Sequence, residues 1–383
     1  MVATISAATV AASLVACGGD DGSTNAVQAG ELLSATPLTG APVLPSAGRS
    51  ELITYISDNA KGEPVVVSGT VQVPKGQAPD GGWPVISWAH GTTGVADACA
   101  PSADFVGGPA HDYLGGVSTE LNRYIDAGYA VVQTDYQGMG TPGGHPYMDG
   151  ITESNAVTDI VRAGRRLDGS LGKTWYAMGH SQGGHAALWA ATKCAERAPE
   201  LDLKGAVAVA PGGDTWQTPE YFRSGSPAVA PMMAFLPLLL LGAQAGDPSI
   251  DAESYVTPES NALLDVGRTQ CIAQIRAMAG TVPVDKAFSP NADVTKLVDY
   301  LKKQNDSTLK PTVPVLVVNG TADVVVPEPG TKKLADQLCK NGGSVAFKTY
   351  PGVDHRGAVG ASVDDATSFA KDAAAGKAFP GTC

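Results

Sequence analysis

The chain has 383 residues, enough for one large domain or two with a sizeable buried core. Its hydrophobic content of 43% and charged content of 17% are those of a globular protein, and 46 Gly with 27 Pro favour a loop-rich exported enzyme. The net charge of −12, with no Lys/Arg-rich block, excludes a nucleic-acid-binding surface, because such a surface needs a basic stripe to contact phosphate.

Residues 1–17 are predicted to be an export signal. The segment is apolar, too short to span a membrane, and ends in Leu-Val-Ala-Cys at Cys17. That ending resembles the lipobox of bacterial lipoproteins, so we expect a lipid on Cys17 that tethers the protein to a membrane. No Lys or Arg precedes the apolar stretch, which leaves a misplaced start site or a simple apolar tail as alternatives. Residues 18–49, rich in Gly, Ser, Pro and Ala, predict a flexible tether.

Residues 50–383 alternate between strand and helix patterns. Val-, Ile- and Thr-rich stretches at 52–57 and 65–73, joined by 59–63, indicate a hairpin. The wholly apolar run 84–89 is typical of a strand buried on both faces of a parallel sheet. Further strands are expected at 129–134, 173–178, 203–210, 313–319 and 344–350, and helices at 117–127 and 151–167. The pattern predicts an α/β fold with a mostly parallel central sheet and helices on both faces.

Residues 212–310 break this rhythm and predict a helical cap inserted between two strands. The segment contains the apolar run 232–241 and later apolar residues at helical spacing. The run could simply pack against the sheet, but its position in the chain favours an apolar cover over a substrate cleft. At about ten residues and with Pro237 inside, it is not expected to span a membrane.

The sequence Gly-His-Ser-Gln-Gly at 179–183 singles out Ser181 as a nucleophile. It is the only G-x-S-x-G match in the chain, and it follows a strand pattern and precedes an Ala-rich helical pattern. In that setting the serine sits on a sharp, strained turn that exposes its hydroxyl.

A serine of this kind needs a histidine to take its proton and a carboxylate to orient the histidine. In α/β hydrolases the order along the chain is Ser, then Asp or Glu, then His. Beyond the helix that follows Ser181, the chain has one histidine, His355, in a Gly/Pro-rich loop after the last predicted strand. Asp323, in the polar turn after strand 313–319, is the predicted acid. Asp354 is the weaker alternative, because neighbouring side chains in an extended loop point apart.

The oxyanion that forms during acyl transfer needs backbone N–H donors. One is expected from Gln182, at the positive end of the helix after the nucleophile. The other is expected from the His-Gly-Thr-Thr loop at 90–93, with Thr92 preferred and Thr93 as the alternative. His90 is expected to stabilise this loop by hydrogen bonding rather than to act in catalysis.

Six cysteines remain to be divided between lipid, disulfides and buried thiols. Cys194 lies in the Ala-rich helix and is expected to be a buried free thiol. The four others beyond Cys17 could pair as 99 with 271 and 339 with 383, although the sequence allows three pairings. No Cys-x-x-Cys occurs, so neither a zinc site nor any other metal or cofactor is expected.

Four ordered motifs, at 88–94, 99–102, 135–143 and 179–183, resemble the secretory lipase family of α/β hydrolases, which includes the fungal lipase A type. The likeness spans residues 51–383. It implies ester hydrolysis through an acyl-enzyme, a helical cap, export, and the two disulfides suggested above. By position it also implies a triad of Ser181, Asp323 and His355. The His-Gly-Thr-Thr loop departs from the fungal pattern and is similar to bacterial members.

The predicted function is therefore that of an exported, monomeric serine hydrolase for carboxylic esters with hydrophobic acyl or alcohol parts, including polymeric esters. It would be a secreted or cell-envelope protein of a bacterium. One rival is an aminopeptidase or amidase, for which Asp251 or Glu253 in the cap could bind the substrate amine. The other is a catalytically inactive lipoprotein that binds an apolar ligand.

Overall fold

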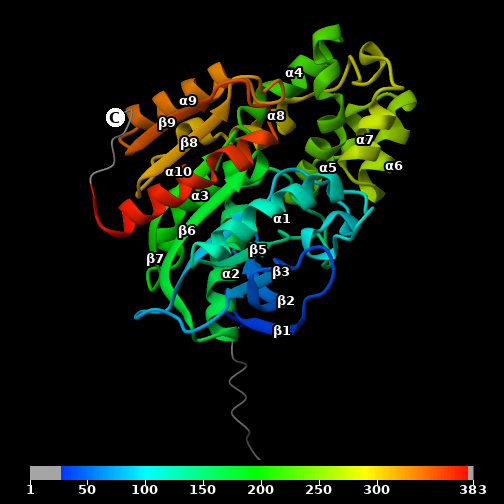
Figure 1. Cartoon of the computed structure of the whole chain (residues 1–383). Helices are drawn as coiled ribbons and strands as arrows, with labels where there is room; N and C mark the ends of the chain where they lie inside the picture. Colours follow the sequence, from blue (N-terminus) through cyan, green and yellow to red (C-terminus); the bar gives the residue numbers. More distant parts are fainter. Residues whose placement is uncertain (1–26, 378–382) are drawn as a thin grey trace, which may run out of the picture.

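The computed structural model of the chain describes residues 27–377 and 383, and its centre is a nine-stranded sheet (Figure 1). The strand order is β1-β2-β3-β5-β4-β6-β7-β8-β9. The β1–β2, β2–β3 and β3–β5 pairs are antiparallel, and all pairs from β5 through β9 are parallel. The strands are β1 (Leu32–Pro37), β2 (Ala47–Asp58), β3 (Pro64–Pro74), β4 (Trp83–Ala89), β5 (Ala130–Thr134), β6 (Leu171–His180), β7 (Asp202–Val209), β8 (Val315–Gly320) and β9 (Val345–Tyr350).

Helices cover both faces of this sheet, as the sequence predicts for an α/β-hydrolase fold. On one face, α1 (His111–Asp126) and α10 (Gly357–Ala374) pack on strand residues such as Val131. On the other, α2 (Gly150–Leu167), α3 (Gln182–Arg197) and α9 (Glu328–Lys340) pack on residues such as Val132. Consecutive residues of a strand point to opposite faces, and this alternation divides the apolar core into two layers.

The predicted tether at 18–49 is wrong in its second half. Residues of β1 pair with β2, so the folded domain includes residues well before position 50. Most residues of β1 are exposed and the strand lies at the edge of the sheet, so its sequence carries no alternating apolar signal. The predicted signal and lipid site at Cys17 lie outside the described residues.

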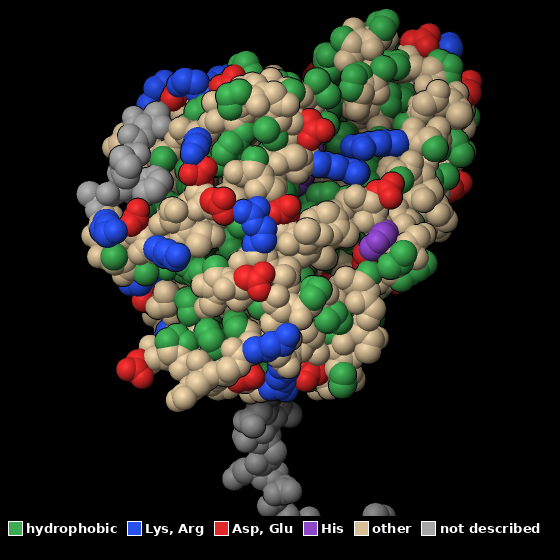
Figure 2. All heavy atoms as spheres, viewed as in Figure 1, with side chains coloured by type: hydrophobic (Ala, Val, Ile, Leu, Met, Phe, Trp, Pro, Cys, Tyr) green, Lys and Arg blue, Asp and Glu red, His purple; other side chains and the backbone are tan. Residues whose placement is uncertain are grey.

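The chain between β7 and β8 forms helices only, among the residues that the structure describes. These helices form a lobe beside the sheet domain (Figure 1), and hydrophobic side chains gather on its surface (Figure 2). The lobe has its own apolar cluster, separate from the two layers on the sheet. Its helices are η3 (Thr215–Gln217), α4 (Thr218–Arg223), η4 (Pro227–Phe235), α5 (Leu236–Gly246), η5 (Ala252–Tyr255), η6 (Pro258–Ser260), α6 (Asn261–Thr269), α7 (Ile272–Ala279), η7 (Val284–Lys286), α8 (Thr295–Lys302) and η8 (Asp306–Thr308).

The apolar run in this lobe is longer than the ten residues expected from the sequence. The continuous helical segment 227–246 is long and apolar enough to cross a membrane by length and composition. However, 61% of it is buried within the protein, as in the core helix of a globular domain. It supplies much of the lobe's own core.

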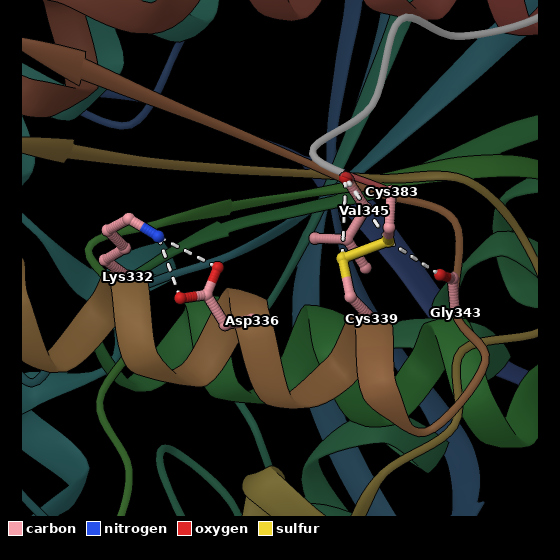
Figure 3. Close-up of a disulfide and its surroundings, with 6 residues drawn as sticks. All are labelled: Lys332, Asp336, Cys339, Gly343, Val345 and Cys383. Atoms are coloured by element: carbon pink, nitrogen blue, oxygen red, sulfur yellow. Dashed lines mark hydrogen bonds and ion pairs between the residues drawn. A yellow bond between two sulfur atoms is a disulfide. The ribbon is translucent and has the colours of Figure 1, made fainter.

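Two disulfides bond the four cysteines in the predicted pairing. Cys99, in η1 (Asp97–Cys99), is joined to Cys271 at the start of α7, so this bond connects the sheet domain to the inserted lobe. Cys339 near the end of α9 is joined to Cys383, which fixes the C-terminus beside β9 (Figure 3). Cys194 is free and buried, as expected.

Candidate active site

Ser181 lies on a tight turn between β6 and α3. Its backbone φ of 57° and ψ of −116° are strained for a residue with a side chain. The turn is possible because the flanking glycines leave room for it. A Cβ on Gly183 would lie 1.8 Å from the carbonyl oxygen of Ala89, and one on Gly179 would lie 2.3 Å from the carbonyl oxygen of Gly183. The G-x-S-x-G motif is therefore a steric requirement of this turn.

Asp323 and His355 meet beside this turn. Asp323 follows β8, and its Oδ2 lies 2.7 Å from Nδ1 of His355, in the loop after β9. The other carboxylate oxygen, Oδ1, accepts the backbone N–H groups of Val325 and Val326, each at 2.8 Å. These bonds hold the buried carboxylate in the plane where it meets the imidazole. The side chain of Asp354 instead accepts the backbone N–H of Gly357, whereas Asp323 is the partner of His355 Nδ1.

A chain of hydrogen bonds connects Ser181's neighbour His180 with both adjacent loops. The backbone N–H of Gly91 donates to the hydroxyl of Tyr113 at 2.9 Å, and this hydroxyl lies 2.9 Å from Nδ1 of His180. Nε2 of His180 lies 2.9 Å from the carbonyl oxygen of His355, and the two rings are 4.5 Å apart. Burial holds the pKa of His180 well below its usual range, so the ring is neutral. A neutral ring fits this series of hydrogen bonds. The Tyr113 hydroxyl donates to Nδ1 of His180, and the Nε2–H group of His180 donates to the carbonyl oxygen of His355.

The predicted oxyanion donors lie on either side of the same turn. Gln182 is the first residue of α3, and its side-chain amide donates to Glu153 at 2.7 Å and lies 2.9 Å from Nε2 of His145. The hydroxyl of Thr92 lies 2.7 Å from that of Tyr147. Thr92 is half-buried, as a residue at the site should be.

Thr93 is fully buried and has a different role. Its carbonyl accepts the backbone N–H of Ile272 at 2.8 Å, at the start of α7. Its burial makes it a poorer candidate than Thr92 to face a substrate. His90 is buried as well, and its Nδ1 lies 2.8 Å from the carbonyl oxygen of Gly91. Burial lowers the pKa of His90 to about 4, so it is a neutral, structural residue of the loop.

A cavity of about 820 Å³ opens beside Ser181, large enough for a drug-sized organic molecule. Ser181 and Gln182 both line it. Part of its wall is apolar and comes from the loop before α2, the inserted lobe and the loop after β8: Tyr147, Met148, Met232, Phe235, Leu239, Val325 and Val326. The apolar run of the lobe therefore both fills the lobe's own core and covers part of the cavity.

Comparison with protein families matches residues 117–379 to the model described as "Secretory lipase". The chain belongs to the secretory lipase family. Among curated relatives, a Mycobacterium tuberculosis protein described as a probable inactive lipase is 29% identical, over 80% of this chain and 69% of that protein. A secreted triacylglycerol lipase of Malassezia globosa is 25% identical, over 82% of this chain and 67% of that protein.

Solved structures show the same fold. Candida antarctica lipase A superposes with a TM-score of 0.76 at 19% identity, over 93% of this chain and 84% of that one. The rice cell wall degrading esterase LipA of Xanthomonas oryzae superposes with a TM-score of 0.67 at 19% identity, over 90% of this chain and 97% of that one. These likenesses confirm the predicted α/β-hydrolase fold.

Sequence reasoning missed the residues that support the candidate site from a distance. Tyr113 and Glu153 lie 67 and 29 residues from their partners His180 and Gln182, and neither belongs to a recognisable motif. Asp251 and Glu253, the predicted amine-binding acids of the rival reading, are not among the residues that line the cavity in the described part of the chain. Glu253 instead pairs with Arg268 on the outside of the lobe.

Proposed function

We propose that this chain is an exported serine hydrolase that cleaves carboxylic esters, with Ser181 as nucleophile, His355 as general base and acid, and Asp323 as the orienting carboxylate. The contact that carries this proposal is the 2.7 Å approach of Asp323 Oδ2 to His355 Nδ1, beside the strained turn on which Ser181 lines the cavity. Asp323 fixes the tautomer in which Nδ1 bears the proton, which leaves Nε2 free to accept one.

In acylation, the Ser181 hydroxyl attacks the ester carbonyl carbon while its proton passes to Nε2 of His355. The carbonyl oxygen becomes an oxyanion, which the backbone N–H groups of Gln182 and Thr92 would bind. Collapse of the tetrahedral intermediate breaks the bond to the alcohol oxygen. His355 returns its proton to that oxygen, so the alcohol leaves neutral and the acyl group stays on Ser181.

In deacylation, His355 takes a proton from a water molecule, which attacks the acyl-enzyme carbonyl. The second tetrahedral intermediate forms at the same oxyanion donors. Its collapse releases the carboxylic acid and restores the Ser181 hydroxyl with the proton from His355. Throughout, the negative charge of Asp323 stabilises the imidazolium form of His355.

The apolar wall of the cavity next to Ser181 supports substrates with a hydrophobic part. Relatives described as secreted triacylglycerol lipases support the same substrate class. A relative described as a probable inactive lipase keeps the ligand-binding alternative open to test. Against that alternative, this chain has all three candidate residues, and two of them are already hydrogen bonded to each other.

A fluorophosphonate probe tests the proposal, because it reacts only with an activated serine. We expect stoichiometric labelling of the wild-type chain and none of Ser181→Ala. Equal labelling of both proteins, or of neither, would favour a binding protein on this fold. p-Nitrophenyl esters compared with aminoacyl p-nitroanilides then separate the enzyme classes: cleavage of the anilides alone would establish an amidase and refute the esterase.

Export and lipidation of Cys17 are separate parts of the proposal. The apolar segment that ends at Cys17 and the secretory family support them. In a bacterial host, Cys17→Ser should move the protein from the membrane fraction to the soluble exported fraction. An unchanged distribution would argue against the lipid tether and would leave the catalytic proposal untouched.

A further inference from the structure

The cavity beside Ser181 is lined by an apolar group and a polar group of residues. The polar group comes from the chain just after β7, from η8 and from α9. That polar group includes Asp214, Gln217, Asn305, Asp306, Ser307, Gln337 and Asn341. Asp214 and Gln217 are exposed, and Asn341 already donates to backbone carbonyls. In the described part of the chain, Asp306 is the member of this group with a buried, unpaired oxygen, which costs free energy unless a ligand pairs with it.

Asp306 is the buried acid of this polar group. Its side chain is 1% exposed, although a carboxylate is rarely buried without a partner. Its Oδ2 has no hydrogen-bond partner within residues 27–377 and Cys383. The carboxyl lies against Gly213, also in the cavity wall, where an added Cβ would approach its oxygens to 2.5 Å. Because residue 213 is glycine, the Asp306 carboxyl keeps space that a side chain at position 213 would occupy.

Ser181 lines the same cavity as Asp306. Because the proposed mechanism leaves the acyl group on Ser181, we place the acyl chain of the substrate in this cavity.

We propose that Asp306 binds a hydroxyl group carried by the acyl chain, so that the site selects esters of hydroxy acids over esters of plain fatty acids. This specificity rests on the proposed ester hydrolysis at Ser181. The apolar wall would hold the methylene segment next to the carbonyl, and the carboxyl of Asp306 would hydrogen bond the hydroxyl further along.

The charges around Asp306 favour a neutral ligand. Burial raises the pKa of Asp306 to about 7, with Asp214 acting in the same direction and His185 against it. With a pKa of about 7, about half of the Asp306 carboxyls are protonated at neutral pH. The protonated form can donate one hydrogen bond and accept another, which suits a hydroxyl.

The test compares p-nitrophenyl esters of hexanoic, octanoic and decanoic acids with those of the matching ω-hydroxy acids. We expect the wild-type kcat/KM to favour the hydroxy ester by about tenfold for at least one chain length, since a site with a buried polar group discriminates strongly against ligands that leave it unpaired. Asp306→Leu should reverse that preference. Asp306→Asn, which keeps the shape and a hydrogen-bonding group, should retain part of it.

p-Nitrophenyl acetate and fluorophosphonate labelling serve as controls for the catalytic machinery, because neither needs to reach Asp306. A wild-type preference for the plain ester at every length, or a preference that Asp306→Leu leaves within twofold, would overturn the specificity proposal. A preference for ω-amino over ω-hydroxy esters would show that Asp306 binds an ammonium group rather than a hydroxyl, and would refute the specificity proposal as stated. If the wild-type protein neither hydrolyses p-nitrophenyl acetate nor reacts with the fluorophosphonate probe, the proposed function itself is refuted.

Discussion

The sheet and the inserted lobe reach the cavity in different ways. The sheet supplies the proposed reactive groups from the ends of parallel strands: Ser181 follows β6, and Asp323 follows β8. The lobe between β7 and β8 supplies cavity wall, with Met232, Phe235 and Leu239, and buries most of its other apolar residues in a cluster of its own. Strand pairing therefore sets the positions of the proposed reactive groups. The attachment of the lobe to the sheet domain sets the shape of the cavity.

The two regions are joined at the oxyanion loop. The Cys99–Cys271 disulfide, the bridge between Gly94 and Cys271, and the hydrogen bond from Ile272 N–H to the Thr93 carbonyl all lie within a few residues of Thr92. A change in how the lobe is held should therefore reach the oxyanion donors as well as the cavity wall.

The largest expected effect is confined to the sheet side. His355→Ala and Asp323→Asn should each lower kcat by about 10⁴-fold, because the first removes the base and the second supports the wrong tautomer. The melting temperature should change little. Collapse of the fold in both variants would instead mark this pair as structural.

The second effect contrasts the two disulfides. Cys99→Ser with Cys271→Ser should lower the free energy of unfolding by about 2–5 kcal/mol and kcat/KM for esters by about tenfold, because the lobe and the oxyanion loop both lose their connection. The measurements are chemical denaturation and steady-state kinetics.

Cys339→Ser with Cys383→Ser is the matched control, because this disulfide joins α9 to the C-terminus and touches no proposed catalytic residue. This double variant should have a lower free energy of unfolding and an unchanged kcat/KM. Equal loss of activity in the two double variants would show that the Cys99–Cys271 bond has no special connection to catalysis.

A smaller effect concerns the link between the loops. Tyr113→Phe removes the hydroxyl that connects Gly91 and His180, which should lower kcat/KM by about tenfold, or about 1.4 kcal/mol, with most of the loss in kcat. Tyr124→Phe, also buried on α1, is the control and should leave kinetics unchanged. If both variants behave alike, Tyr113 contributes packing only.

The smallest effect is a pH dependence of stability that resides in the sheet domain. The pKa of His90 is lowered to about 4 in the folded chain, below an unfolded value of about 6.5. The unfolded chain therefore takes up a proton first, and stability is complete above pH 6.5 and declines as the pH falls toward 4. Between pH 6.5 and 5.5 this histidine should cost about 1 kcal/mol, measured by urea unfolding. His90→Asn should show a shallower pH slope; an unchanged slope would assign the dependence elsewhere.

Local patterns in the sequence were sufficient to predict most strands of the sheet and the pairing of Asp323 with His355. Strands such as β4 and β5 are short apolar runs bounded by loops, and such runs need no knowledge of their neighbours. Asp323 and His355 each follow a strand at the same edge, so the order of elements was enough to bring them together. Ser181 carries a motif whose glycines are demanded by the turn itself.

The remainder depends on contacts that no local pattern records. The edge strand β1 is mostly exposed and so leaves no periodic trace. Tyr113 lies before the helix expected at 117–127, and Asp306 begins the short helix η8, which has no periodic pattern. Their contacts come from residues far along the chain. The lobe's helix boundaries depend on packing within its own cluster rather than on a repeated pattern.

The Cys99–Cys271 disulfide has a consequence for when the protein becomes active. Thiols stay reduced in the cytosol and oxidise after export. If the chain is exported and hydrolyses esters as proposed, it would carry Ser181 before the lobe is fastened to the loop at 90–93. The proposed activity would then become complete only outside the cell that makes the protein.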